Sequence, residues 1–361
     1  MQITNIRTRL LSVPFDRPIT TATFSVNHKD IVVIEVDTDA GITGMSYIMT
    51  LGRGIHALKA VIDYEIRSLV IDEDPLYRQK IWKKLWWGLH KIGRKGAAIY
   101  AISAIDVALW DIAGKMTNQS IHQMLGPACD SIEAYGGGGW LYMSIDDMLE
   151  EVNTFKQKFG FKAYKMRAGS TNWRQDVDRI RALREAFGYD LEIMVDLNQG
   201  LDVPSSIILG RELEKLGVFW FEEPIHADDI GGLSDIAATL DMRVVAGENE
   251  YGRYGYKDLI NRKAADILQI DLQRVGGITE WMRVANTADT MGIKVTPHLF
   301  WEISVQLTCA TTNSIYIEYM DWLDNCFEEL PEIKGGHIHA WKKPGHGLKF
   351  RDEIMKNYEI K

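Results

Sequence analysis

Eight short apolar runs divide the chain between residues 131 and 320, each about 20 to 30 residues after the last. Stretches with helical periodicity, such as VDRIRALREAFG and SIILGRELEKLG, lie between them. Strands that alternate with helices predict a parallel sheet, and eight such units predict an α/β fold, a TIM-like (β/α)7β barrel. The predicted barrel strands are 132–139, 162–168, 192–199, 220–224, 243–249, 267–273, 293–299 and 315–320.

The first 125 residues follow a different pattern, which predicts an α+β unit beside the barrel. The turn sequence DTDAGITG follows a β-rich run and indicates a hairpin. The predicted strands are 1–12, 31–37 and 45–49, and the predicted helices are 55–70, 75–89 and 96–114, the last ending at Gly114. We therefore expect an N-terminal α+β capping domain (1–125), a barrel domain (126–325) and a C-terminal segment (326–361) that returns to the capping domain.

Composition excludes several classes of partner. The 361 residues carry a net charge of −9 without a basic tract, so we expect no nucleic-acid partner. The N-terminal sequence MQITNIRTRLLSVPF lacks the apolar core of a signal peptide, and no segment approaches about 18 uninterrupted apolar residues. We therefore expect a cytoplasmic protein that does not enter membranes. The widely spaced Cys129, Cys309 and Cys326 are expected to be buried thiols.

Three carboxylates end consecutive predicted strands. Asp196, Glu222 and Glu248 are separated by 26 residues each, one strand and one helix apart. Barrel enzymes carry their chemistry at this end of the strands, so the three side chains should converge. Grouped carboxylates repel one another unless a cation lies among them, and all-oxygen ligation favours Mg²⁺. The sequence therefore predicts a magnesium site, although a single acidic residue at a strand end is more often a salt-bridge partner or a helix cap.

Other strand ends supply a base and two cations. Asp271 and His298 end neighbouring strands, where the carboxylate would fix the imidazole tautomer and raise its basicity. Lys165 and Arg167 are two positions apart on one strand, so they share a face. Such a site would stabilise the doubly charged enediolate that forms when a proton leaves the carbon next to a carboxylate.

Together, these motifs resemble the mandelate racemase branch of the enolase superfamily, and the resemblance covers nearly the whole chain. It rests on the helix containing IDVALWD, then on GFKAYKMRAG, IMVDLNQGLDVP, WFEEP, AGEN and HLFWEIS, with Glu318 after them. The metal ligands that it implies are Asp196, Glu222 and Glu248. It also implies that His298 and Asp271 form a dyad on one face of the substrate. Glu318 would hydrogen-bond the carboxylate oxygen that becomes enolic, and Lys165 would neutralise the bound carboxylate.

Arg167 departs from the family pattern, which has a second lysine as the base on the opposite face. A guanidinium stays protonated and clamps anions, so racemisation with two bases is disfavoured. Elimination with one base fits better: His298 would remove the α-proton or return one. Lys165 would be a second proton carrier if Arg167 and the metal depress its pKa.

The resemblance implies a Mg²⁺-dependent dehydratase that converts a small-molecule sugar acid to a 2-keto-3-deoxy acid. The alternative is a cycloisomerase that opens the ring of a sugar-acid lactone or 3,6-anhydro aldonate by the same enolate chemistry. A non-catalytic binding protein and a hydrolase that uses metal-bound water are more remote alternatives. The resemblance also implies a homo-oligomer.

Two segments of the capping domain, 16–30 and 50–54, are expected to close as lid loops over the barrel. The candidate substrate-binding residues are Arg17, His28, Asn198 and Arg167. Arg17, His28 and also Arg53 would meet sugar hydroxyls or a distal carboxylate, but exposure to solvent explains these three equally well. The glycine run at 136–139 lacks the spacing of a phosphate loop, so we expect it to allow close approach of a ligand or of the capping domain. The aromatic residues Trp82, Trp86 and Trp87 are expected to pack between domains or subunits.

Overall fold

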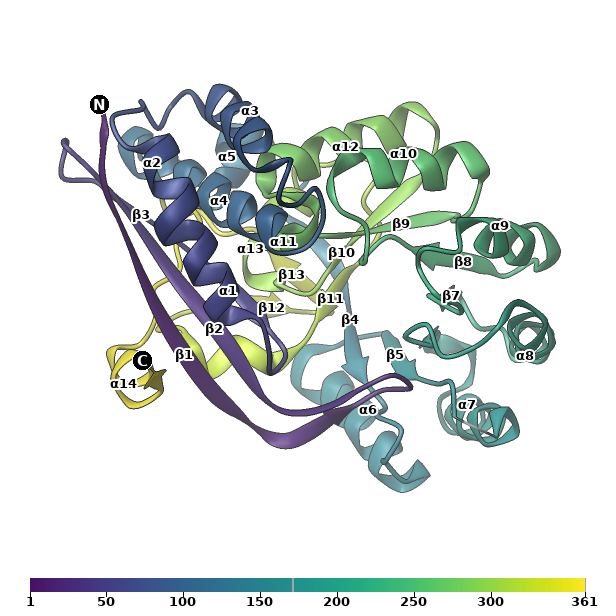
Figure 1. Cartoon of the computed structure of the whole chain (residues 1–361). Coiled ribbons are helices and arrows are strands. Elements are labelled where there is room, and N and C mark those ends of the chain that lie inside the picture. Colours follow the sequence, from purple (N-terminus) through teal and green to yellow (C-terminus); the bar gives the residue numbers. More distant parts are fainter. Residues whose placement is uncertain (171, 361) are drawn as a thin grey trace.

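The barrel contains the predicted succession of strands and helices (Figure 1). The computed structural model describes residues 1–170 and 172–360. The parallel strands are β4 (Ser131–Gly138), β5 (Ala163–Arg167), β6 (Glu192–Asp196), β7 (Trp220–Glu222), β8 (Arg243–Ala246), β9 (Ile267–Asp271), β10 (Lys294–His298) and β11 (Ile317–Tyr319). The helices between them are α6 (Ile145–Phe159), α7 (Trp173–Phe187), α8 (Val203–Lys215), α9 (Ile230–Thr239), α10 (Gly252–Arg262), α11 (Leu272–Val275) with α12 (Ile278–Thr290), and α13 (Trp301–Thr308). Seven predicted runs contain one of these strands and the first is offset from β4 by one residue, so the predicted (β/α)7β fold is confirmed.

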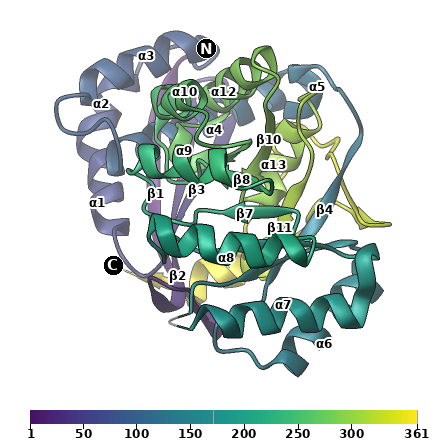
Figure 2. The ribbon, with the colours of Figure 1, turned by 90° about the vertical axis from the view of Figure 1, so that its right-hand side faces the viewer.

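The sheet curls until its last strand meets its first. β11 pairs with β4 in parallel register, with Glu318 opposite Tyr135. A bridge between Val295 and Ser314 ties β10 to the residues that precede β11. The helices α7 to α10 lie around the outside of the sheet (Figures 1 and 2). The carboxyl ends of the parallel strands therefore meet at one mouth.

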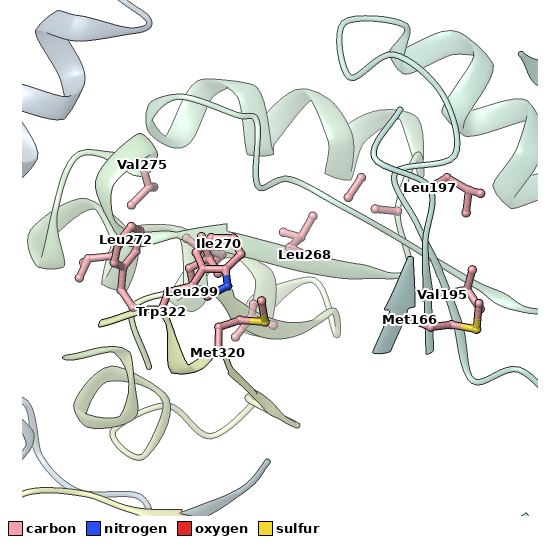
Figure 3. Packing of buried hydrophobic residues seen from close by; sticks show 14 of the residues in the cluster. Met166, Val195, Leu197, Leu268, Ile270, Leu272, Val275, Leu299, Met320 and Trp322 are labelled. Carbon is pink, nitrogen blue, oxygen red and sulfur yellow. The ribbon is translucent and has the colours of Figure 1, made fainter. Parts of the chain in front are cut away.

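Strand side chains alternate between two buried layers. The layer under the helices includes Met166, Val195, Leu268 and Ile270 (Figure 3). A separate apolar cluster on the opposite strand faces includes Ala163, Met194, Trp220 and Val245. Two positions after Ala163, Met194 and Trp220 come the polar residues Lys165, Asp196 and Glu222. Alternate residues of a strand share a face, so these polar side chains point the same way as the inner cluster and lie nearer the mouth. The two-residue period of the strands thus directs the polar side chains inward, above an apolar floor.

The capping domain is built on an antiparallel sheet with the order β14-β1-β2-β3. Its long strands are β1 (Ile3–Thr20), β2 (Ser25–Thr38) and β3 (Thr43–Thr50). The predicted strands are confirmed, but the loop expected at 16–30 is mostly strand, because β1 and β2 continue as a ribbon and only residues 21–24 turn. The pairing shifts register between Pro14 and Ile19, where proline lacks an N–H to donate. This irregularity breaks the alternation that would have indicated a strand.

Helices cover this sheet. They are α1 (Ile55–Ala60), the π-helix η1 (Val61–Ile66), α2 (Arg67–Val70), α3 (Arg78–Leu89), α4 (Ala97–Thr117) and α5 (Ile121–Leu125). Helix α4 does not end at Gly114, as we expected, but continues until Asn118 caps it with a φ of 53°. Gly114 instead permits close packing, since a Cβ there would lie 2.4 Å from the backbone nitrogen of Gly345. Among the described residues, only α4 is long and apolar enough to cross a membrane, and 89% of its apolar window is buried within the protein.

The C-terminal segment divides its contacts between the two domains. β14 (Glu359–Ile360) pairs antiparallel with β1, and Leu10 lies opposite Ile360. β12 (Ile333–Lys334) and β13 (His337–His339) form a hairpin that adds to β4 of the barrel, which the sequence did not predict. The 3-10 helix η3 (Asp321–Cys326) leads into this segment, and α14 (Asp352–Asn357) lies within it. The domain boundaries at 125 and 325 stay predictions.

Two glycines of the run at 136–139 make room for a helix of the barrel, which we did not expect; close approach of a ligand or of the capping domain to this run stays a prediction. A Cβ at Gly136 would lie 2.4 Å from the ring of Phe155, and one at Gly138 would lie 2.0 Å from the carboxylate of Glu151. Both partners belong to α6. The glycines therefore let this helix pack directly on β4.

One expectation about buried thiols needs correction. Cys309 and Cys326 are buried, but Cys129 is exposed, because it lies in the connection between α5 and β4. Trp82 is buried and donates to the backbone oxygen of Gly276 in the barrel domain, as expected for packing between domains. Trp87 is 59% exposed, and its packing between subunits stays a prediction.

Candidate active site

Asp196, Glu222 and Glu248 meet at the mouth of the barrel. Asp196 ends β6, Glu222 ends β7, and Glu248 follows β8 after Gly247, whose φ of 129° turns the chain. One carboxylate oxygen from each residue lies within 4.8 Å of the other two, and all three residues are buried. We call these residues the triad. Negative charges this close repel strongly when water is excluded, so a cation among them would stabilise the arrangement.

Each triad carboxylate has a basic side chain against it. The pairs are Arg167 with Asp196, Lys165 with Glu222, and His298 with Glu248. Lys165 Nζ lies 2.7 Å from Glu222 Oε1. The other oxygen, Glu222 Oε2, is buried without a hydrogen-bond partner among the described residues. A buried oxygen that lacks a donor fits a metal ligand, and a set of carboxylate oxygens fits Mg²⁺.

The triad carboxylates differ in proton affinity. Burial raises the pKa of Glu222 well above its usual value, and the charge of Lys165 only partly offsets the effect. Burial acts on Glu248 in the same direction, but the charges of His298 and Arg274 outweigh it and hold the pKa of Glu248 below its usual value. A bound divalent cation would favour the deprotonated form of both carboxylates.

His298 and Asp271 form a buried pair at the ends of β10 and β9, where they lie opposite each other in the parallel register. His298 Nδ1 is 2.7 Å from Asp271 Oδ2. The other oxygen of Asp271 accepts hydrogen bonds from the backbone N–H groups of Gln273 and Arg274, both at 2.8 Å. Burial raises the pKa of Asp271, but the hydrogen bond with His298 and the charge of Arg274 outweigh it and lower the pKa. An ionised Asp271 accepts from Nδ1–H, which leaves Nε2 as the basic nitrogen beside the triad.

Glu318 connects the cation pair to the barrel wall. Its Oε1 lies 2.8 Å from Lys165 Nζ, and its Oε2 accepts from the backbone N–H of Leu299 at 2.9 Å. Burial raises the pKa of Glu318. The positive charges of Lys165, His298 and Arg167 outweigh burial and lower this pKa to about 2. An ionised carboxylate accepts hydrogen bonds and does not donate them. Glu318 would therefore have to gain a proton before it could take the donor role that the resemblance implies.

The pKa of Lys165 is raised in this structure, so Arg167 alone does not depress it. Burial and Arg167 do lower it, but the carboxylates of Glu222 and Glu318 outweigh them. Arg167 is buried too; burial lowers its pKa, but Asp196 and other carboxylates outweigh burial and raise it. Both side chains are therefore cations in this geometry, and Lys165 is better suited to stabilising charge than to carrying a proton.

Of the other candidate substrate residues, only Asn198 contacts the triad. It follows β6 with a φ of 43°, and its Nδ2 donates to Asp196 Oδ2 at 3.0 Å. Arg17 is exposed and lines a cavity of about 220 Å³ whose lining, among the described residues, includes neither the triad nor the dyad. His28 packs where the two lid segments meet, since a Cβ at Gly52 would lie 3.7 Å from its ring. The structure does not bring Arg17 or His28 to the triad.

The lid segments do reach the barrel. At the tip of the β1–β2 ribbon, the Cβ of Ala22 would lie 3.1 Å from a Cβ at Gly169 and 2.7 Å from one at Gly200. These glycines belong to the loops after β5 and β6. Arg53, in the second segment, lines a cavity of about 340 Å³ together with Asp271. Thr50, Leu51 and Gly54 of the same segment line this cavity too, so the second lid segment shares a cavity with the dyad carboxylate.

Our sequence interpretation assigned no role to a group of side chains behind the triad. Arg274 NH1 donates to the backbone oxygen of Glu248 at 2.9 Å, to its Oε1 at 3.2 Å and to Asn249 Oδ1 at 3.0 Å. Asn249 Nδ2 donates to both carboxylate oxygens of Glu223, at 2.9 and 2.7 Å. Arg274 lies three residues after Asp271, about one helical turn. This spacing from the dyad carboxylate was the sequence feature that could have identified Arg274 as a residue of the site.

Known families show the same two-part organisation. Residues 5–126 match the N-terminal domain of the mandelate racemase / muconate lactonizing enzyme family, and residues 147–354 match the enolase C-terminal domain-like family. The chain belongs to this enzyme superfamily. The resemblance inferred from the motifs is thereby confirmed, and this family member is an enzyme rather than a binding protein.

Curated relatives of this enzyme act on sugar acids. It is 32% identical over 344 residues to the arabinonate dehydratase of Saccharolobus solfataricus, and this alignment covers 92% of this chain and 91% of that protein. It is 34% identical over 324 residues to the L-talarate/galactarate dehydratase of Salmonella typhimurium, and this alignment covers 89% of this chain and 80% of that protein. Sugar-acid cycloisomerases are also among its relatives.

A solved structure supports the metal assignment. A racemase from Streptomyces coelicolor A3(2), crystallised with bound magnesium, superposes with a TM-score of 0.96 and 28% sequence identity, covering 99% of this chain and 100% of that one. Two observations confirm the predicted Mg²⁺ cofactor: the solved relative holds magnesium, and this enzyme has a carboxylate triad that fits the ion. The residues that would hold it are Asp196, Glu222 and Glu248.

Proposed function

We propose that this enzyme removes the α-proton of a sugar-acid carboxylate and expels the β-hydroxyl as water, which gives a 2-keto-3-deoxy acid. The observation that carries the proposal is the orientation of His298. Asp271 holds its Nδ1 at 2.7 Å, while its Nε2 lies 3.2 Å from Glu248 Oε2 of the triad. A base is thus directed at the place where a carboxylate substrate would lie. The dehydratases among the relatives support the choice of sugar acids as substrates.

The metal and the cation pair would supply charge, and His298 would move the proton. Mg²⁺ held by the triad supplies positive charge that makes the α-proton of the substrate more acidic. His298 Nε2 accepts that proton, and the electron pair of the C–H bond moves into the carboxylate to form the enediolate. Lys165 and Arg167 stabilise the additional negative charge. The electron pair of the enediolate then forms the Cα–Cβ double bond and the carboxylate is restored, while the Cβ–O bond breaks and the imidazolium gives its proton to the departing hydroxyl, which leaves as water. The resulting enol becomes the ketone.

Arg167 argues against racemisation. A racemase needs a second base that accepts or returns a proton on the opposite face of the α-carbon. Arg167 instead forms a buried ion pair with Asp196, and a guanidinium does not give up its proton in a protein. Elimination with a single base fits the residues of this chain better.

The cycloisomerase remains the second candidate. It shares the removal of the α-proton, but its leaving oxygen stays attached to the substrate because it belongs to a ring. The similarity to the 3,6-anhydro-α-L-galactonate cycloisomerase of Streptomyces coelicolor, 29% identical over 96% of each chain, favours this alternative.

A substrate screen with Mg²⁺ tests the proposal. Aldonic and aldaric acids, their lactones and their anhydro derivatives would be incubated with the enzyme, and 2-keto-3-deoxy products would be detected. We expect turnover of open-chain acids, with loss of the α-hydrogen that depends on His298. Turnover of ring-containing acids alone would reject the dehydratase in favour of the cycloisomerase, and absence of α-hydrogen loss from all of them would reject both. The cytoplasmic location and the homo-oligomeric state stay predictions.

A further inference from the structure

The capping domain holds the segment that directly follows the dyad carboxylate Asp271. This segment, residues 272–279, contains α11 and the start of α12. Its hydrogen bonds to the capping domain are Ser103 Oγ to Leu272 O at 2.9 Å, Met49 N to Gln273 Oε1 at 3.1 Å, Gln273 Nε2 to Tyr47 O at 3.2 Å, Trp82 Nε1 to Gly276 O at 2.8 Å, Thr279 N to Asp106 Oδ2 at 2.8 Å and Trp110 Nε1 to Thr279 Oγ1 at 3.0 Å. The partners come from β3, α3 and α4, so several elements of the capping domain contact this one segment.

A glycine pair lets the two domains approach this closely. Gly277 has a φ of 91°, and a Cβ there would lie 2.6 Å from Asp106 Oδ2. Gly276 has a φ of 106° and faces the ring of Trp82. Side chains at these positions would push α4 and α3 away from the barrel.

Arg274 connects this interface to the triad. Its Nε donates to the hydroxyl oxygen of Tyr100 on α4 at 2.9 Å. Its NH1 donates to the backbone oxygen and Oε1 of Glu248, at 2.9 and 3.2 Å, and to Asn249 Oδ1 at 3.0 Å. The guanidinium is planar, so a hydrogen bond at Nε restricts the direction in which NH1 points.

We infer that Arg274 is a positioning residue through which Tyr100 of the capping domain orients Glu248 for metal binding. The inference rests on the proposed metal site, and it adds a dependence of metal affinity on the contact between Tyr100 of the capping domain and Arg274. Arg274 contacts both the main chain and the side chain of Glu248, so it fixes the direction of the carboxylate as well as its position. Residues that orient metal ligands in this way typically change metal affinity by about 10- to 100-fold when they are replaced.

The test measures Mg²⁺ binding by titration calorimetry on the full chain, without substrate. We expect Arg274→Gln to weaken Mg²⁺ binding about 10- to 100-fold. We expect Tyr100→Phe, which keeps Arg274 but removes the hydroxyl that accepts from its Nε, to weaken binding by a smaller factor. The matched control is Trp110→Phe, which removes a hydrogen bond from α4 to the same segment without contact to Arg274 or the triad. We expect the control to lower the melting temperature and to leave Mg²⁺ affinity unchanged.

Each outcome decides the inference. Wild-type Mg²⁺ affinity in a folded Arg274→Gln variant would overturn it. If that variant does not fold, Tyr100→Phe decides, and wild-type affinity there would overturn it as well. Equal weakening by Trp110→Phe and Tyr100→Phe would show that general domain docking, and not Arg274, controls the metal. Failure of the wild-type enzyme to bind Mg²⁺ would reject the metal site itself, which is a separate result from any difference among the variants.

Discussion

His298 and Asp271 lie opposite each other at the ends of two paired strands, and Nδ1 of the imidazole is 2.7 Å from Oδ2 of the carboxylate. This hydrogen bond fixes the ring so that its other nitrogen points toward Glu248 of the triad, 3.2 Å away. The base and the metal site are therefore held in one geometry by the backbone register of the barrel. Changes to either group should affect different steps, which makes their roles separable by experiment.

Replacement of His298 should stop proton transfer and spare metal binding. Asparagine retains a group that can donate to Asp271, but it cannot accept a proton from carbon. We expect His298→Asn to lower kcat by about 10²- to 10⁴-fold, the usual contribution of a general base. Turnover of the best substrate and calorimetric Mg²⁺ binding would be measured on the same preparation. Turnover within threefold of wild type would show that another residue is the base.

Replacement of Arg167 by lysine restores the family pattern and should change the stereochemical outcome. Wild-type enzyme should leave the configuration of unreacted substrate unchanged, because no base stands on the second face. We expect Arg167→Lys to release the ion pair with Asp196 and to allow slow epimerisation at the α-carbon. Proton NMR of substrate recovered from D₂O measures both epimers. Epimerisation by the wild type would contradict the single-base mechanism.

Removal of divalent metal should destabilise the protein as well as inactivate it. A ligand that binds only the folded state at 100 times its Kd adds about 2.7 kcal/mol to the free energy of unfolding. We expect EDTA to lower the melting temperature, Mg²⁺ to restore it, and Asp196→Asn to abolish the difference. The matched control is Asp178→Asn on α7, whose carboxylate is 63% exposed and pairs only with Arg181 among the described residues. If the melting temperature of the wild type does not change when Mg²⁺ is removed or added, the triad does not bind the metal.

The buried carboxyl of Asp106 should make stability depend on pH near neutrality. Burial raises the pKa of Asp106 to about 7, although hydrogen bonds from Thr279 oppose the rise. An aspartate in the unfolded chain has a pKa of about 3.9. Between that pH and about 7 the unfolded state loses this proton while the folded state keeps it, so the free energy of unfolding falls as the pH rises through this range. We expect Asp106→Asn, which stays uncharged, to be the more stable protein at pH 8 by up to about 4 kcal/mol.

Urea unfolding at pH 5 and pH 8 measures the effect of Asp106. The informative quantity is the difference in unfolding free energy between wild type and Asp106→Asn, because other groups that titrate in this range contribute to both proteins. We expect this difference to grow from pH 5 to pH 8 in favour of the variant. A difference that does not change with pH would mean that Asp106 stays ionised at both values.

The sequence predicted the barrel and the triad because both follow from short-range regularity. Asp196, Glu222 and Glu248 each end one strand of a repeating unit, so a constant spacing of 26 residues carries them to the same place. The dyad was predictable for the same reason, since parallel neighbours bring their last residues together.

The residues that the sequence did not predict depend on distant partners. Arg274 meets Tyr100 across 174 positions in the chain, and no local pattern encodes that contact. The β1–β2 ribbon was expected as a loop because Pro14 and the polar residues after it interrupt the alternation. The sequence argument made a depressed pKa of Lys165 conditional on Arg167 and the metal, and it did not weigh the carboxylates of Glu222 and Glu318, which raise that pKa.

The pairing of β14 with β1 has a consequence for how the chain reaches its final state. Arg9 Nε donates to Glu359 Oε1 at 2.8 Å across a separation of 350 residues. Closing so long a loop is entropically costly and slow unless intermediate structure first brings its ends together. The barrel provides that structure, so we expect the outer edge of the capping sheet to form late in folding. Until then β1 presents an open edge, which makes the partly folded chain the species most exposed to aggregation.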